Sequence, residues 1–355
     1  MSKITIITAI LALLVSFSCK DRHQPKTTNR YLVDTIGFAQ YPWQMDSVMA
    51  RIDIDDKLPS DQVYKAAICP HDDYAYAAGL FNKTLAGIKA NTIILVGVAH
   101  RARNYKLENK LIFGTYKQWD SPYGSVTISP LRDQWVSSLN KDTFVIHDDM
   151  IQLEHSLEAI VPFLQKNNKS VEIIPLLVPA MAFENMKLFS KELSETMATL
   201  MKAQQLTYGK DIAVVISSDA IHYGNEGWGG ANMAPFGVDS IGNEKAKQKD
   251  LTITNNCLVG SLTTNDVQLF NDYTVSESNF RAYKWTWCGR YSVPMGLLFA
   301  NQLNENLNSQ PLNGTLIDWR SSLHNPHIEV TDIGMGHTAK ANANHWVAFI
   351  GVGYQ

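Results

Sequence analysis

Three short apolar runs, each followed closely by a histidine, constrain the fold of this chain more than any other feature. The runs cover residues 66–69, 93–97 and 212–216, and the histidines are His71, His100 and His222. Short apolar runs of this kind are typical of strands buried on both faces of a parallel sheet. Ligands of open α/β sheets lie beyond the carboxyl ends of such strands. The three histidines are therefore expected to share one site.

Segments with helical and strand patterns alternate along the rest of the chain. Helices are predicted over residues 76–89, 154–165 and 183–201, with two more within 240–270 and another beginning at 294. Strands are predicted over residues 111–113, 125–128, 171–178, 312–320 and 346–352. Pro175 lies inside one of them, which indicates an edge strand or a bulge. The alternation predicts an α/β fold with a mainly parallel or mixed central sheet and helices on both faces.

The N-terminal residues have the pattern of an export signal. Lys3 precedes a mostly apolar run over residues 4–17, too short to span a bilayer comfortably but suited to a signal-peptide core. Cys19 follows where the run ends, as in bacterial lipoproteins, so we expect residues 1–18 to be a signal peptide and Cys19 to be lipidated. Residues 19–30 then form a tether. The expected location is a membrane-anchored lipoprotein of a bacterial envelope, with a secreted or periplasmic soluble protein as the alternative.

Composition limits the remaining possibilities. Residues 31–355 have no Gly/Ser/Pro-rich linker near their middle and no internal repeat, which favours a single domain. The formal net charge is -3 and there is no basic run, so nucleic acid is not an expected partner. If Cys19 is lipidated, three cysteines remain. An odd number in an exported protein indicates at least one free or metal-bound thiol.

Ligand-type side chains gather at the predicted strand ends. His71, His100, His222 and Cys288 carry nitrogen and sulfur donors that bind late first-row metals. Asp219 lies between the third strand and His222, and His155 is expected near the start of a helix. Each has a simpler alternative, since a histidine after a strand is often a loop hydrogen-bonder and a buried cysteine is often a small apolar residue.

Several motifs occur in a fixed order. They are residues 37–42 (GFAQYP), 70–76 (PHDDYAY), 97–100 (GVAH), 154–158 (EHSLE), 162–164 (PFL), 217–224 (SSDAIHYG) and 288–290 (CGR). In this order they resemble the Memo family, whose bacterial members are often called AmmeMemoRadiSam system protein B. The chain departs from the family pattern at Asp72 and Asp73, where Ala-Gly is usual, and at Arg101, where a second histidine is usual.

The resemblance implies a fold similar to that of class III extradiol dioxygenases. It also implies one metal ion held by His71, His100 and Cys288, with Asp219, His222 and His155 lining the same cleft. Iron is the favoured metal, and the cysteine lets copper or zinc compete. Asp219 and His222 are expected to act on substrate or to orient ligands, with Asp219 as a simple helix or turn cap being the alternative.

Three functions remain open at this point. The first is a metal-dependent oxidoreductase acting on a small-molecule substrate, with His222, Asp219 and His155 as its catalytic residues. The second is a surface protein that binds metal or handles redox chemistry without turnover. The third is a hydrolase that uses Cys288, His222 and Asp219. Apart from a small substrate, the one expected partner is the membrane, reached through the lipid on Cys19.

Overall fold

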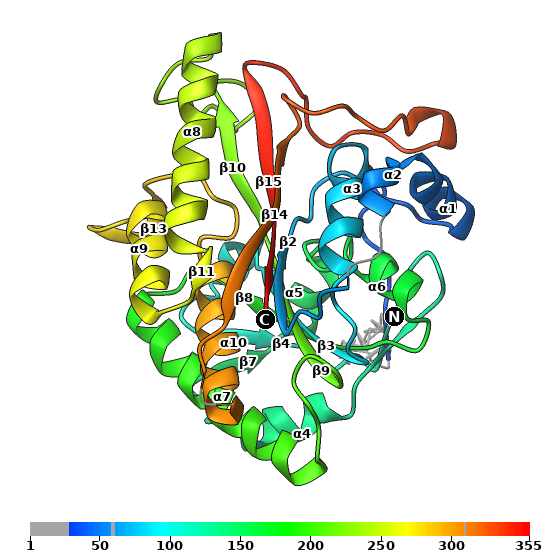
Figure 1. Ribbon diagram of the computed structural model, residues 1–355, viewed down its shortest axis with the longest axis vertical. Coiled ribbons are helices and arrows are strands. Elements are labelled where there is room, and N and C mark those ends of the chain that lie inside the picture. The colour runs from blue at the N-terminus through cyan, green and yellow to red at the C-terminus, as the bar shows by residue number, and fades with distance from the viewer. Residues whose placement is uncertain (1–27, 58–60, 309) are drawn as a thin grey trace, which may run out of the picture.

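The computed structural model describes residues 28–57, 61–308 and 310–355 (Figure 1). The predicted signal peptide, Cys19 and nearly all of the tether lie outside these residues. None of the helices in the described ranges is long and apolar enough to cross a membrane.

A large mixed sheet organises the described residues. Its central strands, in spatial order, are β8 (Glu172–Val178), β3 (Thr92–Val98), β9 (Ile212–Ser217), β2 (Ala66–Cys69), β15 (His345–Tyr354) and β14 (Asn313–Ser321). The first four are mutually parallel, and β15 runs antiparallel to β2 and β14. Shorter strands extend the sheet: β1 (Asn29–Arg30), β4 (Leu111–Phe113), β5 (Gln118–Trp119), β6 (Val126–Ile128), β7 (Phe144–Ile146), β10 (Asp219–Gly224) and β11 (Gly260–Ser261). A separate hairpin pairs β12 (Val275–Ser276) with β13 (Asn279–Tyr283).

Helices cover both faces of this sheet (Figure 1). One face carries α4 (Leu131–Ser138), α7 (Phe183–Gln204), α8 (Ser240–Cys257), α9 (Thr264–Thr274) and α10 (Ser292–Asn308). The other carries α1 (Pro42–Arg51), α3 (Tyr74–Leu85), α5 (Asp148–Leu153) and α6 (Val161–Asn167). The remaining helical segments are α2 (Ile54–Lys57), η1 (Ala102–Tyr105) and η2 (Thr331–Ile333).

Successive side chains of each central strand point to opposite faces of the sheet, so the core has two halves, one on each face. In β3, Ile94 and Val96 belong to the cluster that includes α7 and α10, whereas Ile93 and Leu95 belong to the cluster that includes α3 and α6. A strand covered on both faces must be apolar at consecutive positions, because successive side chains point to opposite faces. The predicted α/β fold with a mixed central sheet is confirmed.

Pro175 lies inside the sheet and not at its edge. Strand β8 pairs along its whole length with β3. On its other side β6 pairs with Glu172 and Ile173, and β4 pairs with Leu177. Pro175 therefore lies in the gap between two short partner strands, where its missing N–H costs no ladder hydrogen bond. The indication of an edge strand or a bulge was wrong.

The helix predicted from residue 154 begins later. Glu154 follows α5 in an extended conformation, and His155 comes next without regular structure. Residues 156–160 form a turn, and α6 starts at Val161. Pro162 explains the difference. Proline is tolerated in the first turn of a helix but would clash with the preceding turn in the middle of a helix from 154 to 165.

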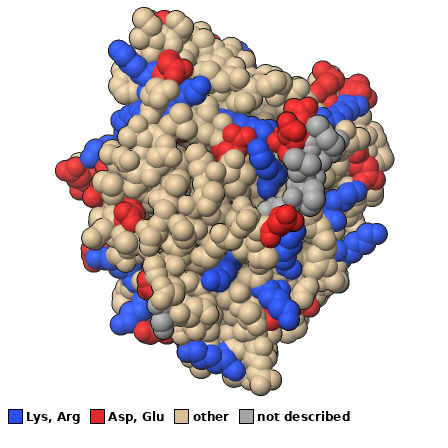
Figure 2. All heavy atoms as spheres, in the orientation of Figure 1, with Lys and Arg blue, Asp and Glu red and all other residues tan. Residues whose placement is uncertain are grey.

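Charged side chains of both signs are scattered over the face shown in Figure 2. They lie mainly toward its rim, and much of its centre is uncharged. No single sign of charge covers this face.

Candidate metal centre

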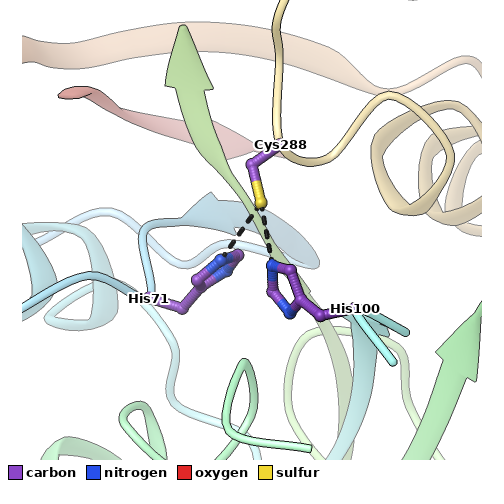
Figure 3. A group of neighbouring side chains, drawn as sticks. All are labelled: His71, His100 and Cys288. Atoms are coloured by element: carbon purple, nitrogen blue, oxygen red, sulfur yellow. Dashed lines mark hydrogen bonds between the residues drawn. The ribbon is translucent and has the colours of Figure 1, made fainter. Parts of the chain in front are cut away.

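Three potential ligands from distant parts of the sequence meet at the carboxyl end of the parallel strands. His71 follows β2, His100 follows β3, and Cys288 precedes α10. Sγ of Cys288 lies 3.1 Å from Nε2 of His100 and 3.4 Å from Nε2 of His71 (Figure 3). His71 and Cys288 are buried, whereas His100 is accessible to solvent.

Local chemistry explains why the two histidines leave the sheet here. Pro70 cannot donate a ladder hydrogen bond, so β2 ends at Cys69. The backbone N–H of His71 then donates to Oδ1 of Asp219 at 2.9 Å instead of to a strand. Asp73 follows at the N-cap of α3, so the chain turns from strand to helix within a few residues. His71 is held at that turn.

The tautomer of His71 follows from its contact with Ser217. The Ser217 hydroxyl donates its single hydrogen to the Ser156 carbonyl at 2.5 Å. It can therefore only accept from Nδ1 of His71, which lies 2.7 Å away. Burial, with His100 and His155 nearby, holds the pKa of His71 well below its usual value, so its Nε2 is unprotonated and presents a lone pair toward Cys288.

Asp219 adds a carboxylate at the same point. Its Oδ2 lies 3.2 Å from Nε2 of His71. Both atoms carry lone pairs when the imidazole is neutral and the carboxyl ionised, so a proton or a cation is needed between them. Burial raises the pKa of Asp219 to about 7, against opposing hydrogen bonds from backbone N–H groups. Asp219 is thus a hydrogen-bonding partner of His71 and a possible fourth ligand.

Glu154 is the carboxylate that hydrogen-bonds to His100. Its Oε1 accepts from Nδ1 of His100 at 2.8 Å, and its Oε2 accepts from the His100 backbone N–H at 2.8 Å. Burial favours the neutral acid, but His100 outweighs it and lowers the pKa of Glu154 to about 2. Burial likewise disfavours charged His100, yet Glu154 and Cys288 raise its pKa well above the usual value. A carboxylate that orients a ligand histidine in this way is common at metal sites.

Sequence reasoning did not assign Glu154 a role in the site. The signal was present, because Glu154 directly precedes His155 in the motif at residues 154–158. The contact became visible only in the structure, since it joins residues 54 positions apart.

The predicted catalytic residues lie around the same point. The His155 ring stacks on His100 with 4.7 Å between ring centroids, and burial lowers its pKa to about 4. His222 lies on β10, a strand the sequence did not predict, and burial lowers its pKa to about 3. Single ligand atoms of Asp219, His222 and Cys288 lie within 4.8 Å of one another. Nε2 of His222 has no hydrogen-bond partner within the described part of the chain.

The donor set suits a soft or borderline metal ion. Ligands held about 2.0–2.3 Å from one ion lie roughly 3–4 Å from each other. Both distances from the sulfur fall in this range, and the three donor atoms all lie within 4.8 Å of one another. Two imidazoles and a thiol favour zinc, copper or iron over magnesium or calcium. Burial raises the pKa of Cys288 although His100 opposes it, and a bound cation would favour the thiolate. The three free cysteines of the described chain include Cys257 and Cys288, so these two do not form a disulfide.

The fold and the site define an α/β protein with a two-histidine, one-cysteine cluster at the end of its parallel strands. Comparison with known proteins gives the family. The family model described as "Memo-like protein" matches residues 40–335, and the chain belongs to this Memo family.

Individual relatives are distant. The chain is 29% identical over 163 residues to a "MEMO1 family protein" of Aquifex aeolicus, covering 45% of this chain and 54% of that one. It is 27% identical over 184 residues to one of Archaeoglobus fulgidus, covering 52% and 64%. It is 30% identical over 165 residues to one of Sulfurisphaera tokodaii, covering 44% and 52%. The matches thus span about half the length of these relatives.

Proposed function

We propose that this protein binds one metal ion through His71, His100 and Cys288 and acts as an oxidoreductase on a small organic substrate. The observation that supports the proposal is that the Nε2 atoms of both histidines lie within 3.4 Å of the Cys288 sulfur. When bound, an iron or copper ion supplies Lewis acidity and electron transfer at this point. Iron is the metal we favour.

The surrounding residues would prepare the site for this ion. Ser217 and Glu154 hold the Nδ1 atoms of His71 and His100, so both Nε2 atoms face Cys288. Asp219 fixes the backbone of His71. His222 and His155 are neutral near pH 7, so each can accept a hydrogen bond or a proton from substrate or water.

A thiol hydrolase is a second candidate, because one chain of contacts favours it. Cys288 contacts His100, and His100 in turn contacts Glu154, which is the order of nucleophile, base and orienting carboxylate. The partner of the sulfur is thus His100 and not His222. The mechanism of such a hydrolase needs one imidazole beside the nucleophile. The second imidazole, that of His71, lies 3.4 Å from the sulfur, which favours the metal site.

Metal analysis separates these functions. The full-length chain should be purified without oxygen and assayed for bound metals, with about one ion per chain expected. Cys288→Ser and His71→Ala should each lose most of it, whereas Cys257→Ser and His337→Ala should retain it. Cys257 is a free cysteine outside the cluster, and His337 is an exposed histidine. Equal metal content in all four variants would contradict the site.

Oxygen uptake distinguishes an enzyme from a metal-binding protein without turnover. The iron-loaded protein should consume oxygen in the presence of its substrate, and Cys288→Ser should not. Metal retention with no uptake against a broad set of small organic compounds would favour the non-catalytic role. Loss of a hydrolytic activity on alkylation of metal-free protein would favour the hydrolase.

We also propose that the protein is exported and anchored to a bacterial membrane through a lipid on Cys19. The support is the apolar run over residues 4–17 and the cysteine directly after it. The globular part would then lie outside the cytoplasm.

A further inference from the structure

We infer that the pocket beside the metal centre binds a small organic acid, whose carboxylate is held by Arg290. This inference names the substrate class for the site proposed above and rests on that proposal. It is based on the buried Arg290 side chain, which pairs with no carboxylate of the residues that the structure describes, and on the charges around it.

The pocket opens directly onto the ligand cluster. It has a volume of about 880 Å³, and His100 and Cys288 form part of its wall. Ligand pockets commonly have volumes of this size. The lining also includes apolar side chains from the ends of β3 and β8, among them Val98 and Val178. The pocket can therefore take an organic molecule that reaches the metal ligands.

Arg290 is a buried side chain of the pocket whose charge and donors are incompletely satisfied. It lines the pocket with only 9% of its surface exposed. Its Nη2 donates to the Arg281 carbonyl at 3.2 Å, but its Nε has no hydrogen-bond partner within the described residues. No carboxylate of those residues forms an ion pair with it. A buried charge left unpaired is costly, so a missing anion is the simplest completion of this site.

Aromatic rings hold the Arg290 guanidinium in place. Its central carbon lies 3.4 Å from the Tyr283 ring centroid and 4.6 Å from that of Tyr291. Contacts of this kind stabilise the cation and restrict its orientation. A guanidinium binds a carboxylate in a planar fork through two adjacent N–H groups, and the Nε of Arg290 is one such group without a partner among the described residues.

The other charges of the pocket point to an anion as well. Glu108 is the one carboxylate in the lining, and both its oxygens are engaged by Arg281 at 2.5 and 2.6 Å. Arg103 and Lys106 are exposed and form no ion pair with any described residue. The uncompensated charge is therefore positive, which attracts anions into the pocket. An organic anion fits better than inorganic phosphate, because the lining includes apolar side chains such as Val98 and Val178.

Calorimetry on the full-length, iron-loaded protein tests the inference. Benzoate is the probe, benzyl alcohol is the neutral probe of similar size, and inorganic phosphate is the second anion. Benzoate should bind more tightly than either. Arg290→Gln should weaken benzoate binding by about tenfold to a hundredfold, because charge-assisted hydrogen bonds are lost. Arg290→Lys keeps the charge without the planar fork and should give an intermediate loss.

The control variant is Arg51→Gln, which changes the net charge equally. Arg51 pairs with Asp332 at the surface and lies outside this pocket. Benzoate binding should be unchanged in this variant. Unchanged binding in Arg290→Gln as well would overturn the inference, as would tighter binding of benzyl alcohol or of phosphate than of benzoate.

Two further measurements keep the test decisive. If Arg290→Gln does not fold, the double variant Arg103→Gln, Lys106→Gln alters only exposed side chains and should weaken benzoate binding severalfold. No loss of binding in that variant would overturn the inference.

Metal content is measured for every protein. A wild-type protein that holds iron without binding benzoate refutes this inference alone. One that binds benzoate through Arg290 but holds no metal refutes the proposed metal site and leaves the acid pocket supported.

Discussion

The sulfur of Cys288 lies 3.1 Å from Nε2 of His100, although 188 residues separate the two. Nδ1 of the same imidazole lies 2.8 Å from Glu154. Carboxylate, imidazole and thiol thus form one continuous chain at the end of the sheet. The predictions below test what this chain and its surroundings do.

Glu154→Gln should weaken metal binding by roughly tenfold to a hundredfold. Glutamine keeps the size of the side chain but removes the charge that orients and polarises His100. Iron or zinc titration of the metal-free protein measures the affinity, and circular dichroism checks the fold. Glu184→Gln is the matched control, because Glu184 is exposed and, within the described ranges, pairs with Lys187 on its own helix. Equal affinity in both variants would remove Glu154 from the site.

Asp219→Asn and His222→Ala should separate two roles. Asp219 contacts His71, so its loss should lower metal affinity by about tenfold or more. His222 has a buried nitrogen without a partner among the described residues, so its loss should leave metal content unchanged and reduce turnover. Metal titration and oxygen uptake measure the two effects. If neither variant changes either quantity, both residues are structural.

Metal removal should lower the melting temperature of the wild-type protein. A ligand that binds only the folded state stabilises it by about 2.7 kcal/mol at a free concentration one hundred times its dissociation constant. Differential scanning fluorimetry with and without a chelator measures this change. Cys288→Ser should show a much smaller chelator effect, and Cys257→Ser should behave as the wild type. A wild-type protein indifferent to metal and chelator would argue against the site.

Asp250 should make stability fall as pH rises from about 4 to about 6. Burial raises its pKa from 3.8 to about 6, although Trp319 and Trp287 donate to it. The unfolded carboxyl loses its proton first, so the unfolded state is favoured increasingly across this window, by roughly 3 kcal/mol in total. Asp34 and Asp219 also have raised pKa values, and His155 and His222 have lowered ones, so the proteins are compared with one another. Between pH 4 and pH 7, urea denaturation should show this loss in the wild type in addition to the change that Asp250→Asn shows. The exposed Asp272→Asn should keep it, and identical pH profiles for all three would contradict the prediction.

Cys19→Ser should change the location of the protein. Without the thiol, lipidation cannot occur, and the protein should appear in the soluble fraction or accumulate as an uncleaved precursor. Fractionation of cells with immunoblotting measures both outcomes. Membrane association and apparent size identical to those of the wild type would show that Cys19 is not the anchor.

The sequence by itself determined the buried parallel strands at the centre of the sheet and the residues that follow them. Buried strands such as β3 are apolar at consecutive positions, and Pro70 marks the end of β2, so both signals are local. His71 and His100 could therefore be expected at one edge of the sheet. Cys288 joined them through the resemblance of residues 288–290 to a family motif, not through spacing.

Only the tertiary structure decided how these side chains are supported. Glu154 became the partner of His100 because Pro162 delays the start of α6 and leaves residues 154–160 outside any helix. The Ser217 hydroxyl set the tautomer of His71 through a hydrogen bond across 146 residues. The Nε of Arg290 was found to have no hydrogen-bond partner among the described residues only once its surroundings were known. Strand endings follow from local sequence, whereas hydrogen-bond partners and unpaired charges depend on atoms that folding brings together from distant segments.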